Sequence, residues 1–105
     1  MKSISLSLLV LAATPLTSAH ADADAVRGKA ISATCVACHG PEGRSMNPLW
    51  PNLAGQKPAY LAKQLKAFRD GTRADPLMMP AAKSLSDTDV EDLAAYFSRV
   101  QPKSE

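Results

Sequence analysis

The chain has 105 residues, with 12 basic and 10 acidic side chains and a formal net charge of +2 at pH 7. This near balance excludes a bulk nucleic-acid binder, because such domains are strongly basic. A disulfide between the two cysteines, Cys35 and Cys38, would close too short a loop to stabilise the fold much. A domain of this size has a barely sufficient side-chain core, so we expect a large apolar cofactor to supplement it.

Residues 1–21 predict an export signal. A positive start at Lys2 precedes a short apolar run, and residues 19–21 form the small-x-small pattern of a cleavage site. The apolar run is far shorter than the roughly 20 residues that cross a bilayer. We therefore expect a cleaved signal peptide, one domain over residues 22–105 and a periplasmic location. A second small-x-small pattern ends at Ala23 and would move the cut by two residues.

Residues 24–34 predict a short helix that leads into Cys35, with Val26, Ala30 and Ile31 on one side. From residue 40 to 58, prolines and glycines are too frequent for a continuous helix or a central strand. Apolar residues are interspersed there, so we expect an ordered loop wrapped over something apolar. These residues are Met46, Leu49, Trp50 and Leu53.

A second helix is predicted from Pro58, a first-turn proline, to Gly71, with an apolar stripe at helical spacing. Basic residues lie away from that stripe and form either a docking face or an ordinary solvated surface. They are Lys57, Lys63, Lys66, Arg69 and Arg73. Residues 71–84, which contain Pro76 and Pro80, predict a second irregular segment.

The last helix has the clearest start signal. Ser86 is a suitable N-cap, Asp89 stands where a capping box needs it, and Leu85 and Val90 form a possible hydrophobic staple. The predicted inner face consists of Val90, Leu93, Ala94 and Phe97. No alternating strand pattern is present, so we predict an all-α fold with three main helices and two ordered loops.

Residues 35–39, Cys-Val-Ala-Cys-His, match the pattern for covalent haem attachment. Two thiols three positions apart on a helical turn can each add to one vinyl group of the haem, and the next residue then supplies an imidazole to the iron. A zinc site would need four ligands, and a thioredoxin-like pair would need alternating strands and helices. We therefore predict one haem c, held by Cys35 and Cys38 with His39 as an iron ligand.

The sixth ligand is constrained by composition. Removal of His20 with the signal would leave His39 as the only histidine, which excludes ligation by two histidines. Met46 follows His39 too closely to reach the opposite face of the haem, whereas Met78 and Met79 are far enough along the chain. A thioether favours ferrous iron, and methionine-histidine ligation raises the reduction potential. The alternative is that both methionines only fill the core.

Several further motifs complete a resemblance to class I c-type cytochromes, and in particular to one half of the di-haem cytochrome c4. They are Cys35 to Gly40, Pro51 to Gln56, Tyr60-Leu61, Gln64-Leu65, Met78, Leu85 to Asp87 and Leu93 to Tyr96. The resemblance covers nearly all of residues 22–105. It implies a class I cytochrome c fold around one covalent haem, and an iron that keeps both axial ligands during single-electron transfer.

The resemblance also implies roles for individual residues. It selects Met78 over Met79 as the iron ligand and gives the Pro51 carbonyl a hydrogen bond with the far ring nitrogen of His39. It further implies that the first and last helices cross closely, with Gly28 and Ile31 packed against Leu93 and against Tyr96 or Phe97.

The sequence therefore predicts a monomeric, non-enzymatic electron carrier that docks transiently on its redox donor and acceptor. A rival interpretation is a haem-based sensor or a small haem enzyme whose distal ligand can be displaced. Another is a thiol-disulfide module without haem. With His39 assigned to iron, no catalytic triad can be assembled from the remaining residues.

Overall fold

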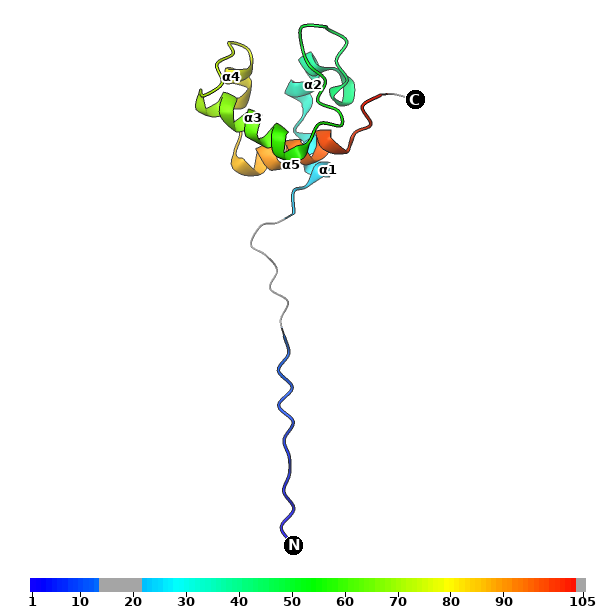
Figure 1. Ribbon diagram of the computed structural model, residues 1–105, viewed down its shortest axis with the longest axis vertical. Helices are drawn as coiled ribbons and strands as arrows, with labels where there is room; N and C mark the ends of the chain where they lie inside the picture. Colours follow the sequence, from blue (N-terminus) through cyan, green and yellow to red (C-terminus); the bar gives the residue numbers. More distant parts are fainter. Residues whose placement is uncertain (14–21, 104–105) are drawn as a thin grey trace.

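The computed structural model describes residues 1–13 and 22–103, and the predicted cleavage pattern at residues 19–21 lies outside them. Residues 1–13 contain no helix and extend away from a helical domain (Figure 1). The domain is built from α1 (Ala25–Ala30), α2 (Ala33–His39), a 3₁₀ turn η1 (Pro41–Gly43), α3 (Pro58–Asp70), α4 (Met78–Ala82) and α5 (Asp87–Arg99). No strand occurs in these described ranges, as the all-α prediction requires.

The single helix predicted over residues 24–34 is wrong, because the chain forms α1 and α2 with a break between them. Ile31 has φ −96° and ψ 4°, outside the helical range. The Ser32 hydroxyl donates to the carbonyl oxygen of Lys29 at 2.7 Å and so competes with the regular helical bonds. Ser32 then accepts from the amides of Cys35 and Val36, which starts α2 in a new direction.

The core lies between α3 and α5. Leu61 and Ala62 of α3 pack with Val90, Leu93, Ala94 and Phe97 of α5. The predicted inner face of α5 is confirmed, since all four of its residues are at most 2% exposed. The predicted helix limits at Pro58 and Gly71 are also confirmed, and Gly71 ends α3 in the left-handed conformation.

The N-terminus of α5 is capped as predicted. The Ser86 hydroxyl accepts from the Asp89 amide at 3.0 Å, and the Asp89 carboxylate accepts from the Ser86 amide at 2.9 Å. This capping box satisfies two backbone donors that the helix itself leaves unpaired.

The helices α1 and α5 cross at Gly28, and they approach each other more closely there than a residue with a Cβ atom would allow. A Cβ atom on Gly28 would lie 2.0 Å from the carbonyl oxygen of Asp92 and 2.9 Å from Cβ of Tyr96. The expected close packing of Gly28 is therefore confirmed, although its nearest neighbour is the backbone of Asp92 rather than Leu93. Ile31 packs against the core at the end of the same crossing.

Buried charge also joins the two helices. The Asp92 side chain, 5% exposed, accepts from the Asp24 amide at 2.7 Å and from the Arg27 guanidinium at 2.8 Å. Arg27 also pairs with Asp89 at 2.6 Å. The Ser86 amide and Arg27 hold the pKa of Asp89 below its usual range, and Arg27 and the Asp24 amide do the same for the pKa of Asp92, because ionised carboxylates are the better acceptors.

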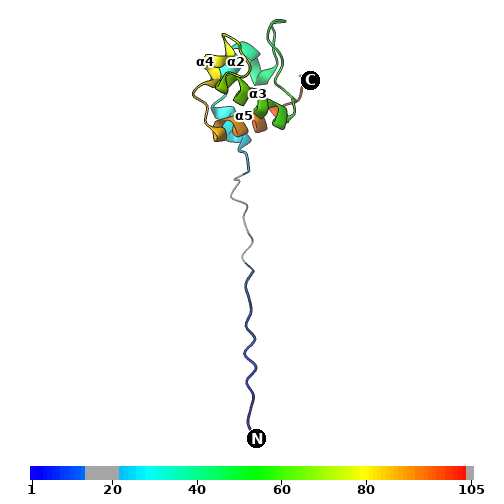
Figure 2. The same cartoon turned by 60° about the vertical axis from the view of Figure 1, so that its left-hand side comes forward.

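Two short helices, α2 and α4, lie on one side of the pair formed by α3 and α5. In both Figure 1 and Figure 2, α2 and α4 lie on the side of α3 and α5 that faces away from the N-terminal segment. Within the described part of the chain, no helix is long and apolar enough to cross a membrane.

Candidate functional site

The α2 helix presents the three residues of the attachment motif. Cys35 is half-buried against the core, whereas Cys38 is exposed, and neither thiol is in a disulfide. Burial raises the pKa of the Cys35 thiol, since the thiolate would lose solvation. His39, the last residue of the helix, is 8% exposed, and Gly40 ends the helix with a φ of 82°. One short helix therefore carries two unpaired thiols and an imidazole whose position is fixed by packing.

The orientation of His39 is set by a residue of the following loop. Its Nδ1 atom lies 2.7 Å from the carbonyl oxygen of Pro51. Because a carbonyl oxygen can only accept, Nδ1 must carry the proton, and Nε2 is left with an unshared electron pair. The expected contact between His39 and Pro51 is confirmed, and it prepares Nε2 to bind a metal.

The residues that follow Pro51 are bonded to the opposite arm of the loop. The Asn52 side chain accepts from the Ser45 amide at 2.7 Å, which ties together the two arms of the loop. The Gly43 carbonyl oxygen accepts from the amides of Leu53 at 2.8 Å and Ala54 at 3.2 Å. The base of the loop is thus anchored to η1, which follows α2, and the Pro51 carbonyl keeps a fixed place beside His39.

The tip of this loop differs from the sequence prediction. Met46 is 88% exposed and Leu49 is 83% exposed, although both were expected to be buried. Trp50 and Leu53 are half-buried, and Leu53 packs against the core. The tip is shaped by polar bonds instead, because the Asn47 side chain accepts from the Leu49 amide and the Asn47 amide donates to the Ser45 hydroxyl. The loop is ordered as predicted, but its tip is not anchored by apolar burial.

The segment that carries the two methionines is also more regular than predicted. Residues 78–82 form the helix α4 inside the segment expected to be irregular, and Pro80 lies in its first turn. A proline is tolerated there because a first-turn amide has no helical partner. The Asp75 carboxylate accepts from the amides of Leu77 at 2.9 Å and Met78 at 2.8 Å. These bonds hold the pKa of Asp75 below its usual range.

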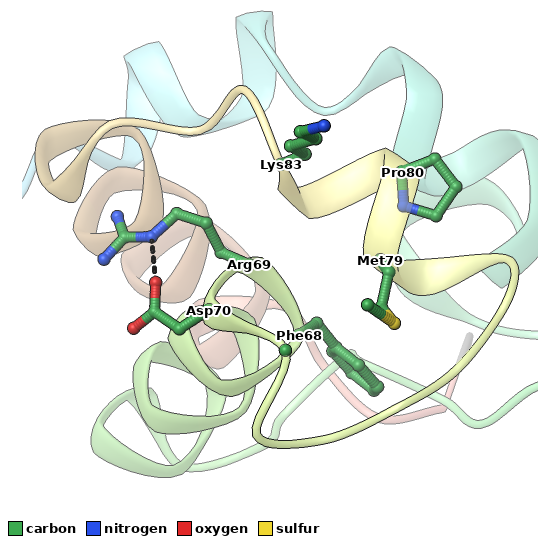
Figure 3. Close-up of a pocket in the computed structure, with 7 residues that line it drawn as sticks. Phe68, Arg69, Asp70, Met79, Pro80 and Lys83 are labelled. Carbon is green, nitrogen blue, oxygen red and sulfur yellow. Dashed lines mark hydrogen bonds and ion pairs between the residues drawn. The ribbon is translucent and has the colours of Figure 1, made fainter.

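Met78 and Met79 lie in different surroundings. Met78 is half-buried, whereas Met79 is 37% exposed and directs its methyl group towards Gly71, with 3.8 Å between Met79 Cε and the position of a Cβ there. Figure 3 shows the Met79 side chain extending from α4 towards Phe68 at the end of α3. It lines an open hollow of about 380 Å³ together with Phe68, Arg69, Asp70, Gly71, Pro80 and Lys83. Met78 does not line this hollow.

The hollow between α3 and α4 is separate from the attachment motif. Neither cysteine nor His39 lines it, and its walls offer a charged rim rather than a set of metal donors. We therefore identify the candidate site from the side chains that can attach a haem or bind its iron. These are Cys35, Cys38, His39 and Met78.

The basic residues around α3 are less available than the sequence indicated. Lys66 pairs with Glu91 at 3.3 Å, and Arg69 pairs with Asp70 at 3.1 Å and with Asp87 at 2.7 Å. The Arg73 guanidinium lies 4.4 Å from the centre of the Phe68 ring and donates to Gln64. Among the described residues, Lys57 and Lys63 have no ion-pair partner, so the basic face keeps part of its charge.

This donor set suits a covalently attached haem. The His39 nitrogen and the Met78 thioether would serve as ligands to a haem iron, and the two unpaired thiols on one helix would form thioether bonds with its two vinyl groups. A family model for cytochrome c matches residues 25–101. The chain belongs to the cytochrome c family.

Cytochrome relatives differ in how much of their length the chain spans. Cytochrome c-554(548) of Halomonas halodenitrificans is 49% identical over 78 residues, which cover 71% of this chain and 94% of the relative. The thiosulfate dehydrogenase electron acceptor of Stutzerimonas stutzeri is 49% identical over 72 residues, covering 66% of this chain and 33% of the relative. The structure of cytochrome c4 from Acidithiobacillus ferrooxidans superposes with a TM-score of 0.71 and 37% identity, covering 79% of this chain and 53% of the other.

These comparisons confirm the class I cytochrome c fold and the haem c cofactor. The chain is an electron-transfer protein with one cytochrome c domain, which fits a carrier of a single haem. It spans about half or less of the cytochrome c4 and of the Stutzerimonas protein, so the activities of those longer proteins do not transfer to it directly.

Proposed function

We propose that this cytochrome binds its haem through thioether bonds to Cys35 and Cys38, with His39 and Met78 as the iron ligands. The observation that carries the proposal is the 2.7 Å bond from His39 Nδ1 to the Pro51 carbonyl oxygen, which leaves Nε2 available to the metal. When bound, the haem supplies an iron that alternates between ferric and ferrous states. The chain's own part is to keep the imidazole and the thioether in place in both states, so that little rearrangement accompanies each electron.

The choice of Met78 is supported by the different surroundings of the two methionines. Met79 is directed towards Gly71 and Phe68 at the end of α3, where it packs as an apolar side chain. Met78 is half-buried, and Asp75 bonds to its backbone amide. Because successive residues of a helix point in directions about 100° apart, two neighbouring methionines cannot both serve one position.

We further propose that the mature protein is a periplasmic monomer that acts as a carrier rather than an enzyme. Its predicted signal over residues 1–21 supports export. The name of the Stutzerimonas relative, an electron acceptor of thiosulfate dehydrogenase, supports a role as acceptor from a redox enzyme. Transient docking fits such a role, because a carrier must leave its donor before it reaches its acceptor.

Substitution of each methionine in turn tests the ligand assignment. In the ferric holoprotein, purified from cells that have haem-attachment machinery, Met78→Ala should abolish the weak long-wavelength sulfur-to-iron absorption band and lower the reduction potential. Met79→Ala should retain the band, because it removes an apolar contact with α3 and no ligand. Absorption spectroscopy and redox titration measure both effects.

The matched pair of variants gives the test its control, since the two substitutions are chemically identical and adjacent. Loss of the band in Met79→Ala alone would contradict the choice of Met78. A purified protein from those cells with no covalent haem and two titratable thiols would overturn the whole assignment. A ferrous form that binds carbon monoxide readily without any substitution would favour the sensor interpretation.

A further inference from the structure

Residues 76–80, here called the methionine segment, have three backbone amide donors, and all three donate to one residue. The carboxylate of Asp75 accepts from the amides of Leu77 and Met78, and its backbone carbonyl oxygen accepts from the amide of Met79 at 3.0 Å. Pro76 and Pro80 have no amide hydrogen to satisfy. From residue 76 to residue 80, every available donor of the chain therefore bonds to Asp75.

Apolar burial does little to hold this part of the chain. Leu77 is 62% exposed and Met79 is 37% exposed, so packing alone leaves the segment weakly restrained. The segment is anchored more firmly at its two ends. Before it, the Arg73 amide donates to the Ala67 carbonyl at 3.1 Å; after it, Ala82 is completely buried. Between these anchors, the Asp75 hydrogen bonds are what fixes the backbone of residue 78.

We propose that Asp75 is a positioning residue for the Met78 thioether. Its carboxylate fixes the backbone of the turn from which the Met78 side chain projects, and it acts as a hydrogen-bond acceptor rather than as a charge near the iron. The proposal rests on Met78 being the iron ligand. A methionine whose backbone is held needs less ordering to stay bound, so an external ligand should displace it less easily.

Competition by imidazole for the iron of the ferric holoprotein tests this role. Asp75→Ala removes both side-chain bonds and should raise the apparent affinity for imidazole about tenfold or more, with a matching weakening of the sulfur-to-iron band. Asp75→Asn keeps an oxygen acceptor and should stay within about threefold of the unsubstituted protein. Asp70→Ala removes a carboxylate that, within residues 1–13 and 22–103, pairs only with Arg69, and it should leave imidazole affinity unchanged.

Equal imidazole affinity in Asp75→Ala and Asp70→Ala would overturn the proposal. So would an Asp75→Asn variant whose imidazole affinity rises as much as that of Asp75→Ala, because the charge rather than the acceptor would then matter. If Asp75→Ala does not accumulate, Asp75→Ser takes its place. Its shorter side chain reaches the two amides less well than that of Asp75→Asn, so its imidazole affinity should be higher than that of Asp75→Asn, and an affinity equal to that of Asp70→Ala would overturn the proposal.

Amide hydrogen exchange separates this inference from the ligand assignment. The amides of Leu77 and Met78 should be protected in the unsubstituted holoprotein and lose protection in Asp75→Ala, while amides within α5 stay unchanged. Fast exchange of both amides without any substitution would overturn the proposal. Survival of the sulfur-to-iron band in Met78→Ala would instead refute the ligand assignment, with the exchange result unaffected.

Discussion

Gly43 shows how a single position supports the loop beside His39. Its φ is 79°, and a Cβ atom there would lie 2.7 Å from Cδ1 of Phe97 and 3.0 Å from Cβ of Leu53. Its carbonyl oxygen also receives the amides of Leu53 and Ala54, which anchor the loop. A side chain at this position would therefore disturb both the core and the loop that carries Pro51.

A pair of glycine variants separates the two costs of substitution. Gly71 has nearly the same φ, 81°, but the nearest atom to an added Cβ is Met79 Cε at 3.8 Å. Gly71→Ala should cost about 1 kcal/mol, the strain of a left-handed alanine. Gly43→Ala should cost a further 1–3 kcal/mol or so from overpacking against Phe97. Urea unfolding of the two holoproteins measures the difference, and equal losses would mean that the contact with Phe97 relaxes freely.

At the residue scale, the sequence revealed the residues predicted to bind the haem more readily than the residues that hold them in position. The attachment motif was visible because its residues lie at a fixed spacing, whereas the Pro51 contact was implied by the resemblance to class I c-type cytochromes. Asp75 and Asn52 were not singled out, although the Asp75 carboxylate accepts from the turn that follows it and the Asn52 side chain accepts from the opposite arm of its loop. An Asp-Pro pair just before Met78 is a turn signal that predicts such a role for Asp75. Asn52 bonds to Ser45 across the loop, and no local pattern predicts that contact.

At the element scale, the contacts between α1 and α5 predict acid sensitivity. The folded-state pKa values of Asp89 and Asp92 lie below those of the unfolded chain, which are about 3.9. The stabilisation they give is therefore complete above that value and is lost as the pH falls through the folded-state pKa values. Asp92→Asn should be less stable by about 1–3 kcal/mol at pH 7, and the difference should shrink towards pH 3.

Urea midpoints at pH 7 and pH 3 measure this linkage. Glu91→Gln is the control on the same helix, because its exposed pair with Lys66, at 3.3 Å, should contribute little at either pH. If Asp92→Asn kept its full deficit at pH 3, the lost stability would come from packing rather than from the ionised carboxylate.

The elements themselves were predictable to different degrees. α3 and α5 follow from apolar spacing and from local signals such as Pro58, Gly71 and Ser86. The break between α1 and α2 was missed, because it depends on a hydroxyl bond from Ser32 that competes with an otherwise helical pattern. The helix α4 was missed because Pro76 before it and Pro80 within it argue against a helix unless the missing amides are already accounted for.

At the scale of the whole molecule, the charge around α3 sets how partners approach. Acidic residues from α5 reduce the field of the five basic residues predicted from the sequence, and they come from positions too distant in the chain for charge spacing to reveal. We therefore expect weak electrostatic steering, centred on Lys57 and Lys63.

Charge reversal at Lys63 tests this expectation with small redox reagents. Lys63→Glu should slow oxidation of the ferrous holoprotein by the anion ferricyanide at low ionic strength, and the difference should vanish at high salt. Lys29→Glu makes the same change on α1 and should have a smaller effect. Stopped-flow rates measure both, and equal slowing would show that net charge acts rather than the face around α3.

The crossing at Gly28 determines how the two ends of the domain depend on each other. A six-residue helix has no stability of its own in water, since its few internal bonds do not offset the cost of nucleation. α1 thus exists as a helix only while the backbone of α5 lies against it. The contacts concerned join residues 65 and 68 positions apart, so the beginning of the folded domain becomes ordered only when α5, near the other end of the chain, lies in place.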